Sequence, residues 1–177
     1  ICDYGFDFYA PQSFSGENTM IAWLNMWDRN TPSAVYGFAG MLTLPRRLSV
    51  EGDRLCQTPV LPGTVPACTQ TLAGSATLSD SGVTGVVTID ATDVRSLTLT
   101  LRQKPGQETV ISVRNGELVF DRSRAGVPIA GAEQDADSLA GIRRMPVDTE
   151  HLALTIVMDR YSVEIFSAGR ALSSTIY

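Results

Sequence analysis

Alternation of apolar and polar residues is the sequence feature that most constrains the fold of this chain. Leu97, Leu99 and Leu101 alternate with threonines, and a second alternating apolar series begins at Leu152 and ends at Met158. Every second side chain of a strand lies on the same face, so each series predicts a strand with one buried face. No stretch keeps the apolar period of a helix over the length that a stable helix needs.

Turn signals separate these strands at the spacing of a β-sandwich. Asn115-Gly116 predicts a two-residue hairpin that joins Glu108–Val113 to Glu117–Phe120. Lys104–Gln107 and Asp159–Ser162 predict two further turns. The expected fold class is therefore all-β, with an antiparallel β-sandwich over residues 76–177.

The N-terminal third shows shorter extended segments. Met20–Leu24 predicts a buried strand followed by a loop, and Gly37–Leu44 predicts a second strand that Pro45 ends. Glu51–Arg54 predicts a turn between two further extended pieces. Together these segments have about the size of one blade of a β-propeller.

A proline- and glycine-rich segment divides the two regions. Gln57–Ser75 contains three prolines and two glycines without any charged residue, which predicts an extended connector lying along a surface. The expected organisation is an incomplete blade over residues 1–56, a linker over 57–75 and a sandwich over 76–177.

Composition excludes several classes of function. The net charge of −5 and the pI of about 4.8 disfavour a nucleic-acid partner, because a phosphate binder needs a basic face. The sequence lacks an apolar run near the ~18 residues that a membrane span requires. We expect no cofactor, no nucleic acid and no membrane partner.

Histidine and cysteine chemistry is sparse. His151 is the only histidine, which nearly excludes histidine triads and multi-histidine metal sites, and we expect it to begin a strand. The three cysteines, Cys2, Cys56 and Cys68, lack the spacing of a metal site. A disulfide between Cys56 and Cys68 is one alternative, and unpaired thiols, which we favour, are the other.

The stretch DYGFDFYAPQ, from Asp3 to Gln12, combines carboxylates with aromatic rings. Carboxylates accept hydrogen bonds from sugar hydroxyls, and flat apolar rings cover the C–H faces of a sugar. A site of this kind is concave and has few polar groups. The alternative interpretation is that the aromatic residues belong to the core and the two aspartates cap turns.

Five stretches resemble motifs of glycoside hydrolase family 32 in the order and spacing of that family. They are DYGFDFYAPQ, then Ile21–Trp27, Tyr36–Leu48, Phe120–Gly126 and Val157–Phe166. The family contains β-fructofuranosidases: invertases, sucrose-6-phosphate hydrolases, levanases and inulinases. The resemblance implies the last blade of a five-bladed catalytic propeller followed by the C-terminal β-sandwich, cut out of a longer protein.

The resemblance also implies a retaining mechanism with an aspartate nucleophile and a glutamate acid/base. The family motifs that carry those residues are absent from this chain, so we expect no catalytic residue and an inactive fragment. The expected substrate-binding residues are Asp3 on the leaving-group side, Asp7, Tyr9 and Gln12 in the pocket wall, and Trp23 at the rim. For Asp7, Tyr9 and Trp23, packing within the blade is an equal alternative.

Carboxylates also occur in two other parts of the sequence. The segment Val127–Pro146 is expected to be a loop, and its Glu133, Asp135 and Asp137 predict a solvated acidic loop because they lack the pattern of a calcium loop. Glu164 lies between Val163 and Ile165, which predicts that its side chain points outward; the alternative, which we do not favour, is a carboxylate pair with Asp159 across the turn. We expect no metal site. Ser167–Arg170 stands where the family has an Asn-Asp-Gly turn, which leaves the type of that turn open.

Two functions from different classes follow. The first is the C-terminal part of a β-fructofuranosidase in which the sandwich braces the propeller, and the second is a stand-alone carbohydrate-binding sandwich without catalysis. We expect a fructose-containing saccharide as ligand. We also expect either self-association through residues 1–55 or disorder there, because a lone blade exposes strand faces and edges. The expected location is cytoplasmic, with secretion as the alternative.

Overall fold

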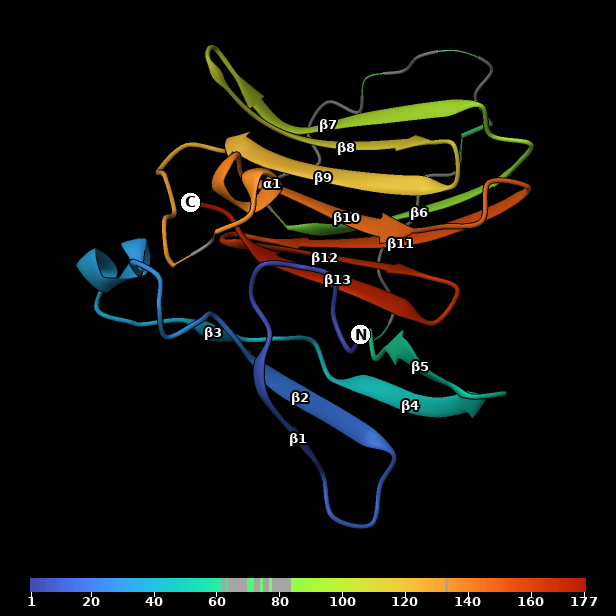
Figure 1. The fold of residues 1–177 in the computed structure, drawn as a ribbon, viewed down its shortest axis with the longest axis horizontal. Helices are drawn as coiled ribbons and strands as arrows, with labels where there is room; N and C mark the ends of the chain where they lie inside the picture. Colours follow the sequence, from blue (N-terminus) through green and yellow to red (C-terminus); the bar gives the residue numbers. More distant parts are fainter. Residues whose placement is uncertain (62, 64–69, 72–73, 75–76, 78–83, 133) are drawn as a thin grey trace.

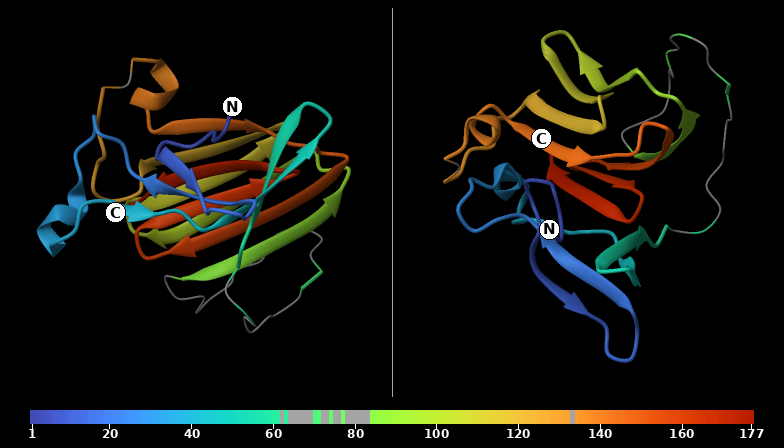
Figure 2. Two further views of the ribbon diagram at one scale, coloured as in Figure 1. Left: turned by 90° about the horizontal axis from the view of Figure 1, so that it is seen from below. Right: turned by 45° about the vertical axis from the view of Figure 1, so that its right-hand side comes forward.

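The computed structural model describes residues 1–61, 63, 70, 71, 74, 77, 84–132 and 134–177. Its strands form three antiparallel sheets that lie one above another, as Figures 1 and 2 show. Two of these sheets make a β-sandwich, and the third, N-terminal sheet packs on the outer face of that sandwich. In this described part, no helix is long and apolar enough to cross a membrane.

The N-terminal sheet is built around β2, which pairs with β1, β3 and β4, while β5 completes the sheet beside β4. Met20, Ala22 and Leu24 of β2 are buried, which confirms the strand predicted there. The strands are β1 (Tyr9–Ser13), β2 (Thr19–Leu24), β3 (Met41–Leu42), β4 (Arg46–Glu51) and β5 (Arg54–Pro59).

The strand predicted over Gly37–Leu44 is wrong for most of its length. A 3-10 helix, η1 (Pro32–Tyr36), ends at Gly37, and the following strand β3 has only two residues. Gly37 and Gly40 both have left-handed backbone conformations, with φ of 86° and 74°. Two such residues turn the chain repeatedly, so an extended strand cannot run through them.

The sandwich contains two four-stranded sheets, in the order β10-β9-β8-β7 and in the order β13-β12-β11-β6. Leu152, Leu154 and Ile156 of β11 are buried between them, which confirms the predicted alternation, and His151 begins that strand. The strands are β6 (Gly85–Thr92), β7 (Ser96–Lys104), β8 (Gln107–Arg114), β9 (Glu117–Arg124), β10 (Ile142–Pro146), β11 (His151–Asp159), β12 (Ser162–Ser167) and β13 (Arg170–Thr175).

The main core lies between the two sandwich sheets. Ile111 and Phe120 from one sheet, with Ile156 and Ile165 from the other, are fully buried there. Each such side chain contributes about 1.5–3 kcal/mol when it leaves water. Phe6, from the N-terminal stretch, belongs to the same cluster, so the chain's first residues share the sandwich core.

Two hairpins use the same backbone geometry with different residues. Asn115 and Gly116 have φ of 53° and 78°, which confirms the predicted two-residue turn between β8 and β9. Ala168 and Gly169 between β12 and β13 also have positive φ, of 45° and 75°. The β12–β13 hairpin therefore has a two-residue turn with positive φ at both positions, at a cost of about 1 kcal/mol for a left-handed alanine.

The segment Val127–Pro146 was expected to be a loop, and this expectation is wrong. It contains a short helix, α1 (Ala136–Leu139), and the edge strand β10. Sequence alternation misses β10 because its residues include two arginines and a proline, and only Met145 is fully buried. Proline is tolerated there because an edge strand has one side without a partner.

The connector predicted over residues 57–75 lies mostly outside the described residues, and its first three residues form the end of β5. Cys68, and with it the question of a bond to Cys56, also lies outside them. The boundaries of the linker therefore stay a prediction.

Candidate functional site

The stretch from Asp3 to Asp7 lies along the free edge of β13, the outermost strand of its sheet (Figure 1). Asp3 accepts hydrogen bonds from the backbone N–H and the hydroxyl of Ser173, both at 2.9 Å. Asp7 accepts from the backbone N–H of Thr175 at 2.7 Å and from its hydroxyl at 2.9 Å. Two carboxylates thus satisfy alternate donors of an edge strand that would otherwise be open to another chain.

Backbone contacts bring the same stretch close to the strand. The N–H of Tyr4 donates to the carbonyl of Ala171, and the N–H of Asp7 donates to the carbonyl of Ser173. A Cβ atom at Gly5 would lie 1.9 Å from the carbonyl oxygen of Ser173. Only glycine fits at this position, because any side chain would collide with the backbone of β13.

Arg46 of β4 ties this arrangement to the N-terminal sheet. Its guanidinium lies 2.9 Å from Asp3 Oδ2 and 2.9 Å from Glu164 Oε2, and all three side chains are buried. It also donates to Gln57 and to the hydroxyl of Ser173. A buried guanidinium needs several acceptors of this kind, because an unpaired charge in the interior is very unfavourable.

The prediction that Glu164 points outward to solvent is wrong. Every residue of β12 is buried, because the N-terminal sheet covers the face of β12 that an isolated sandwich would expose to water. Glu164 Oε1 accepts from the N–H of Leu44 at 2.7 Å, and the other oxygen pairs with Arg46. The alternation correctly places Glu164 on the other face of β12 from Val163 and Ile165, but both faces of this strand are buried.

Burial raises the pKa of Asp3 and of Glu164 above their ordinary values, and the nearby Arg46 opposes that rise. One guanidinium serves two carboxylates, so the cluster carries a net negative charge when both are ionised. Removal from water disfavours that charge, which is why burial outweighs the attraction to Arg46.

Asp7 forms the second charged cluster. Its Oδ1 lies 2.9 Å from Arg29 Nη1 and its Oδ2 lies 3.1 Å from Arg122 Nη1. Asp7 is completely buried, and Arg122 lies over the ring of Phe6 at 3.7 Å. Asp7 thus connects the loop after β2, which carries Arg29, to β9 and β13 of the sandwich.

Three aromatic rings, two exposed and one half-buried, contact one another at the surface, and we call them the aromatic triad: Tyr9, Trp27 and Trp23. The ring centroids of Trp23 and Trp27 are 5.1 Å apart, and those of Tyr9 and Trp27 are 6.0 Å apart, in edge-to-face geometry. Trp27 is 74% exposed and Tyr9 is 39% exposed. Aromatic rings held rigidly at the surface can stack on the C–H face of a sugar.

The five predicted site residues therefore fall into two groups. Tyr9 and Trp23 face each other across the β1–β2 pair, and Gln12 lies exposed on the same strand as Tyr9. Asp3 and Asp7 have buried side chains, and their carboxylates are bound to protein donors. A direct contact between Asp3 or Asp7 and a sugar stays a prediction.

Sequence reasoning omitted Trp27, although its spacing of four from Trp23 was visible.

The two described carboxylates of the acidic segment near α1 both bind protein groups. Asp135 caps α1 by accepting from the N–H of Ser138 at 2.9 Å, and the side chain of Asp137 pairs with Arg144. The residues described include no group of three or more carboxylate, histidine or cysteine side chains suited to a metal ion. Glu133 lies outside them.

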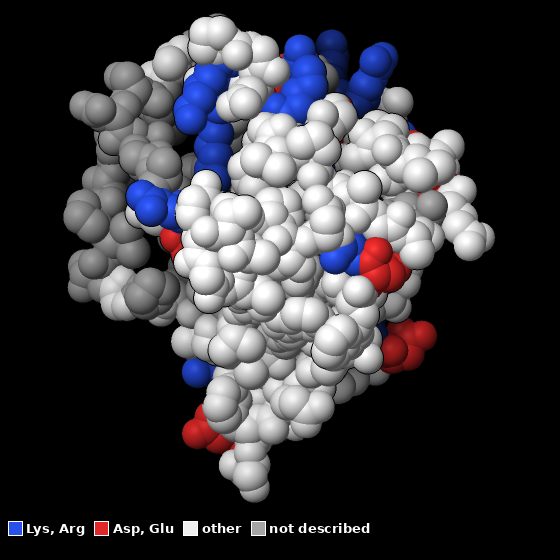
Figure 3. Space-filling model, turned by 90° about the vertical axis from the view of Figure 1, so that its left-hand side faces the viewer, with Lys and Arg blue, Asp and Glu red and all other residues white. Residues whose placement is uncertain are grey.

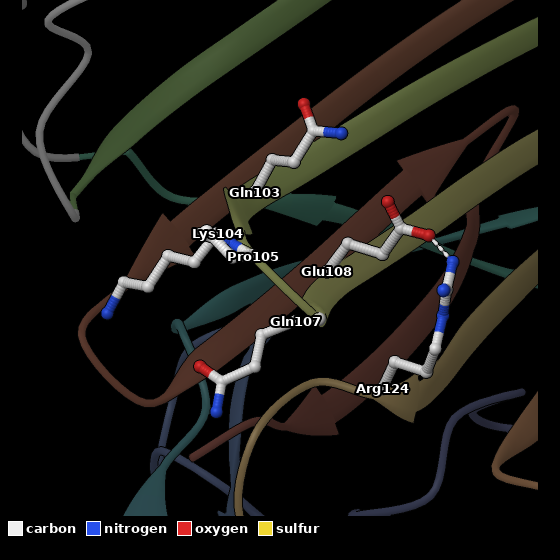
Figure 4. A pocket seen from close by; sticks show the side chains of 7 residues that line it. Gln103, Lys104, Pro105, Gln107, Glu108 and Arg124 are labelled. Atoms are coloured by element: carbon white, nitrogen blue, oxygen red, sulfur yellow. Dashed lines mark ion pairs between the residues drawn. The ribbon is translucent and has the colours of Figure 1, made fainter.

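A polar hollow lies on the β7–β8 hairpin of the sandwich (Figure 4). Gln103, Lys104 and Gln107 line it, and the ion pair between Glu108 and Arg124 closes one side. Figure 3 shows basic side chains gathered over the sandwich part of one face, whereas the rest of that face is largely uncharged. The hollow contains no aromatic ring, so it lacks the stacking surface of the aromatic triad.

Comparison with family models divides the chain in two. Residues 1–59 match the model described as "Glycosyl hydrolases family 32 N-terminal domain". Residues 62–177 match "Glycosyl hydrolases family 32 C terminal". The motifs singled out in the sequence lie in both parts.

Curated relatives agree with these matches. The chain is 36% identical to a raffinose invertase of Escherichia coli, over 99% of this chain and 38% of that protein. It is 31% identical to a sucrose-6-phosphate hydrolase of Zymomonas mobilis, over 93% of this chain and 34% of that protein. The chain thus spans little more than a third of the length of these relatives.

A solved structure has the same fold. A family 32 β-fructofuranosidase from Bombyx mori superposes with a TM-score of 0.71 at 24% identity, covering 99% of this chain and 37% of the other. The likeness extends across the sandwich and the N-terminal sheet together.

Proposed function

This chain belongs to glycosyl hydrolase family 32, and from that premise we propose that the protein containing it hydrolyses β-fructofuranosidic bonds. The names of relatives support the bond type, because they include a raffinose invertase, a levanase and several sucrose-6-phosphate hydrolases. The Bombyx mori relative has also been solved in complex with sucrose. The choice among sucrose, sucrose 6-phosphate and a fructan stays open.

Within that protein, the proposed role of the sandwich is to brace the N-terminal sheet. The observation that carries this role is the pair of buried ion clusters, in which Arg46 meets Glu164 and Asp7 meets Arg122. Each cluster joins a residue of the N-terminal region to a sandwich strand. Separating the two parts would leave a charge buried without its partner or expose it to water, so the clusters fix the two parts in one arrangement.

The proposed sugar-facing surface is the aromatic triad together with Gln12. Tyr9 and Trp23 were predicted from sequence, and Trp27 is added because it is the most exposed of the three rings. Asp3 and Asp7 support this surface from behind. No residue of this chain is proposed as nucleophile or acid/base, so the chain alone is expected to be inactive.

The test compares the isolated chain with the full-length protein that contains it. Fructose release from sucrose, sucrose 6-phosphate and levan is measured for both at equal concentration. We expect turnover by the full-length protein only, because general acid–base help alone accounts for about 10²–10⁴ in rate. Turnover by the isolated chain that disappears when one of its own carboxylates is changed would contradict the assignment.

Binding of these saccharides by the full-length protein without any fructose release would favour the alternative, a carbohydrate-binding module. Fructose release and saccharide binding are therefore measured on the same preparation of the full-length protein. A folded but catalytically inactive sample of that protein serves as the control for binding.

Self-association is also proposed, through the β1 edge of the N-terminal sheet. All five residues of β1 are exposed, and β1 is the outermost strand of its sheet. An exposed edge can pair with another chain. Light scattering over a range of concentrations tests this proposal, and a monomer at every concentration would contradict it.

A further inference from the structure

Asp7 binds two different parts of the molecule through its two carboxylate oxygens. Oδ1 accepts from Arg29 at 2.9 Å. Oδ2 accepts from Arg122 at 3.1 Å and from the N–H and hydroxyl of Thr175 at 2.7 and 2.9 Å. The first partner belongs to the loop after β2 and the others to the sandwich, so this single carboxylate lies at their junction.

All three residues of the aromatic triad lie between Asp7 and Arg29 in the sequence, and two of them are close to the paired charges. Tyr9 comes two residues after Asp7, and Trp27 comes two residues before Arg29. Only Phe8 and Asp28 separate the rings from the paired charges. Because Asp7 and Arg29 are joined, the backbones that carry Tyr9 and Trp27 are held together immediately beside those rings.

We propose that Asp7 is a positioning residue. Through its bonds to Arg29, Arg122 and Thr175, it holds the aromatic triad in a fixed position relative to the sandwich. The sandwich then acts on the proposed sugar-facing surface through a defined contact and not only as a general support. The catalytic consequence of this inference rests on the proposed function, but the structural part can be tested on this chain alone.

The environment of the contact explains why it can hold a fixed geometry. Asp7 is completely buried, and the Arg29 side chain is 5% exposed. Arg29 also donates to the backbone carbonyl of Phe6, so its guanidinium has a second fixed acceptor. Charge-assisted hydrogen bonds with several fixed partners are short and directional, and burial protects them from water and salt.

A neighbouring contact provides a comparison within the same loop. Asn30 donates to the carbonyl of Pro128 and accepts from the N–H of Ala130, which also anchors the loop to the sandwich. These hydrogen bonds are exposed and carry no formal charge. If Asp7 fixes the position of the triad through Arg29, loss of the Arg29 side chain must disturb the rings more than loss of the Asn30 side chain does.

The optical properties of the chain make the triad directly observable. Trp23 and Trp27 are the two tryptophans of the chain, so all tryptophan emission comes from the triad. Their ring centroids are 5.1 Å apart, close enough for coupled electronic transitions that give a circular dichroism couplet. That couplet depends on the distance and angle between the rings.

The experiment compares Arg29→Met, Asp7→Asn, the double variant and Asn30→Ala with the unchanged chain. Arg144→Met serves as the matched control, because Arg144 pairs with two exposed carboxylates elsewhere on the sandwich. The tryptophan couplet and emission report the triad, and hydrogen exchange of β11 and β12 reports the sandwich. Arg29→Met is decisive, since Asp7 then keeps Arg122 and Thr175 and the sandwich stays folded.

We expect Arg29→Met and Asp7→Asn to lose most of the couplet while β11 and β12 stay protected. The double variant should resemble the single ones, because both changes remove the same contact. Arg144→Met should leave the couplet unchanged, and Asn30→Ala should reduce it less. A couplet that survives Arg29→Met overturns the proposal, as does a loss that occurs only when the sandwich itself unfolds.

In the full-length protein, Arg29→Met should raise the KM for the saccharide about tenfold and change kcat little, because a misplaced binding surface weakens substrate and transition state alike. A lower kcat at unchanged KM would overturn the positioning role. If the full-length protein shows no fructoside hydrolysis, the proposed function fails, while the couplet still decides the positioning role.

Discussion

Arg46 Nη2 lies 2.9 Å from Glu164 Oε2, and this ion pair joins β4 of the N-terminal sheet to β12 of the sandwich. The same guanidinium binds Asp3, and it lies between the rings of Phe8 and Phe166, at 4.5 and 5.3 Å. The opening stretch of the chain, the blade-like sheet and the sandwich therefore meet at one buried cation.

Removal of Arg46 should destabilise the whole chain. Arg46→Met leaves two buried carboxylates without their cation, and breaking a buried pair in this way costs about 3–5 kcal/mol. Urea denaturation measures the loss. The triple change Arg46→Met, Glu164→Leu and Asp3→Asn should recover part of the stability, because it removes the unpaired charges. Arg54→Met, at an exposed ion pair, is the control and should leave stability nearly unchanged, because solvent screens such a pair.

The stability should depend on pH through Glu164. Burial raises its pKa above the ordinary value of 4.5, so the folded chain retains this proton at a pH where the unfolded chain has released it. The resulting stabilisation is complete below pH 4.5 and is lost as the pH rises through the folded-state pKa. Asp3 acts in the same direction.

Glu164→Gln tests this directly, because glutamine keeps the shape and does not titrate. We expect the free energy of unfolding of the unchanged chain to fall, relative to that of the variant, as the pH is raised above 4.5. Parallel stability curves for the two proteins from pH 4 to 8 would show that Glu164 does not titrate in this way.

Gly5→Ala should disturb the docking of the opening stretch on β13. The new Cβ would lie 1.9 Å from Ser173 O, so the two backbones must separate, at a cost of about 1–3 kcal/mol or more. Hydrogen exchange at the amides of Ser173 and Thr175 should accelerate. Gly63→Ala is the control, because a Cβ at Gly63 meets no atom of the described residues within 4 Å. Unchanged protection of both amides would contradict the close contact.

Trp27→Ala should weaken sugar binding while leaving the stability of the fold nearly unchanged. The ring is 74% exposed, so its removal should change the free energy of unfolding by about 0.5 kcal/mol or less. Binding of sucrose or levan by the full-length protein should weaken, because the most exposed ring of the triad is lost. Calorimetric titration measures the affinity, and Val35→Ala, at a residue 82% exposed, controls for loss of surface area. Unaltered affinity would remove Trp27 from the binding surface.

Local sequence determined the strands and turns of this protein. Leu97 and Leu154 lie in alternating series, and Asn115-Gly116 supplies the two residues that a left-handed turn requires, so each feature depends on its immediate neighbours. The aromatic and acidic character of the opening stretch was likewise visible, as was the family resemblance. Short or irregular elements were missed: η1 and β10 have too few apolar residues for a pattern to emerge.

Only the tertiary structure decided which charged residues are interior. The local sequence indicates that Glu164 points outward from its strand. It is buried because the N-terminal sheet covers that face, and the residues of this sheet lie more than a hundred positions earlier in the chain. Asp3 and Asp7 read as site or turn residues, and their partners Ser173 and Thr175 lie at the opposite end of the chain. Periodicity reports which side of a strand a residue occupies, whereas what packs against that side depends on long-range contacts between sheets.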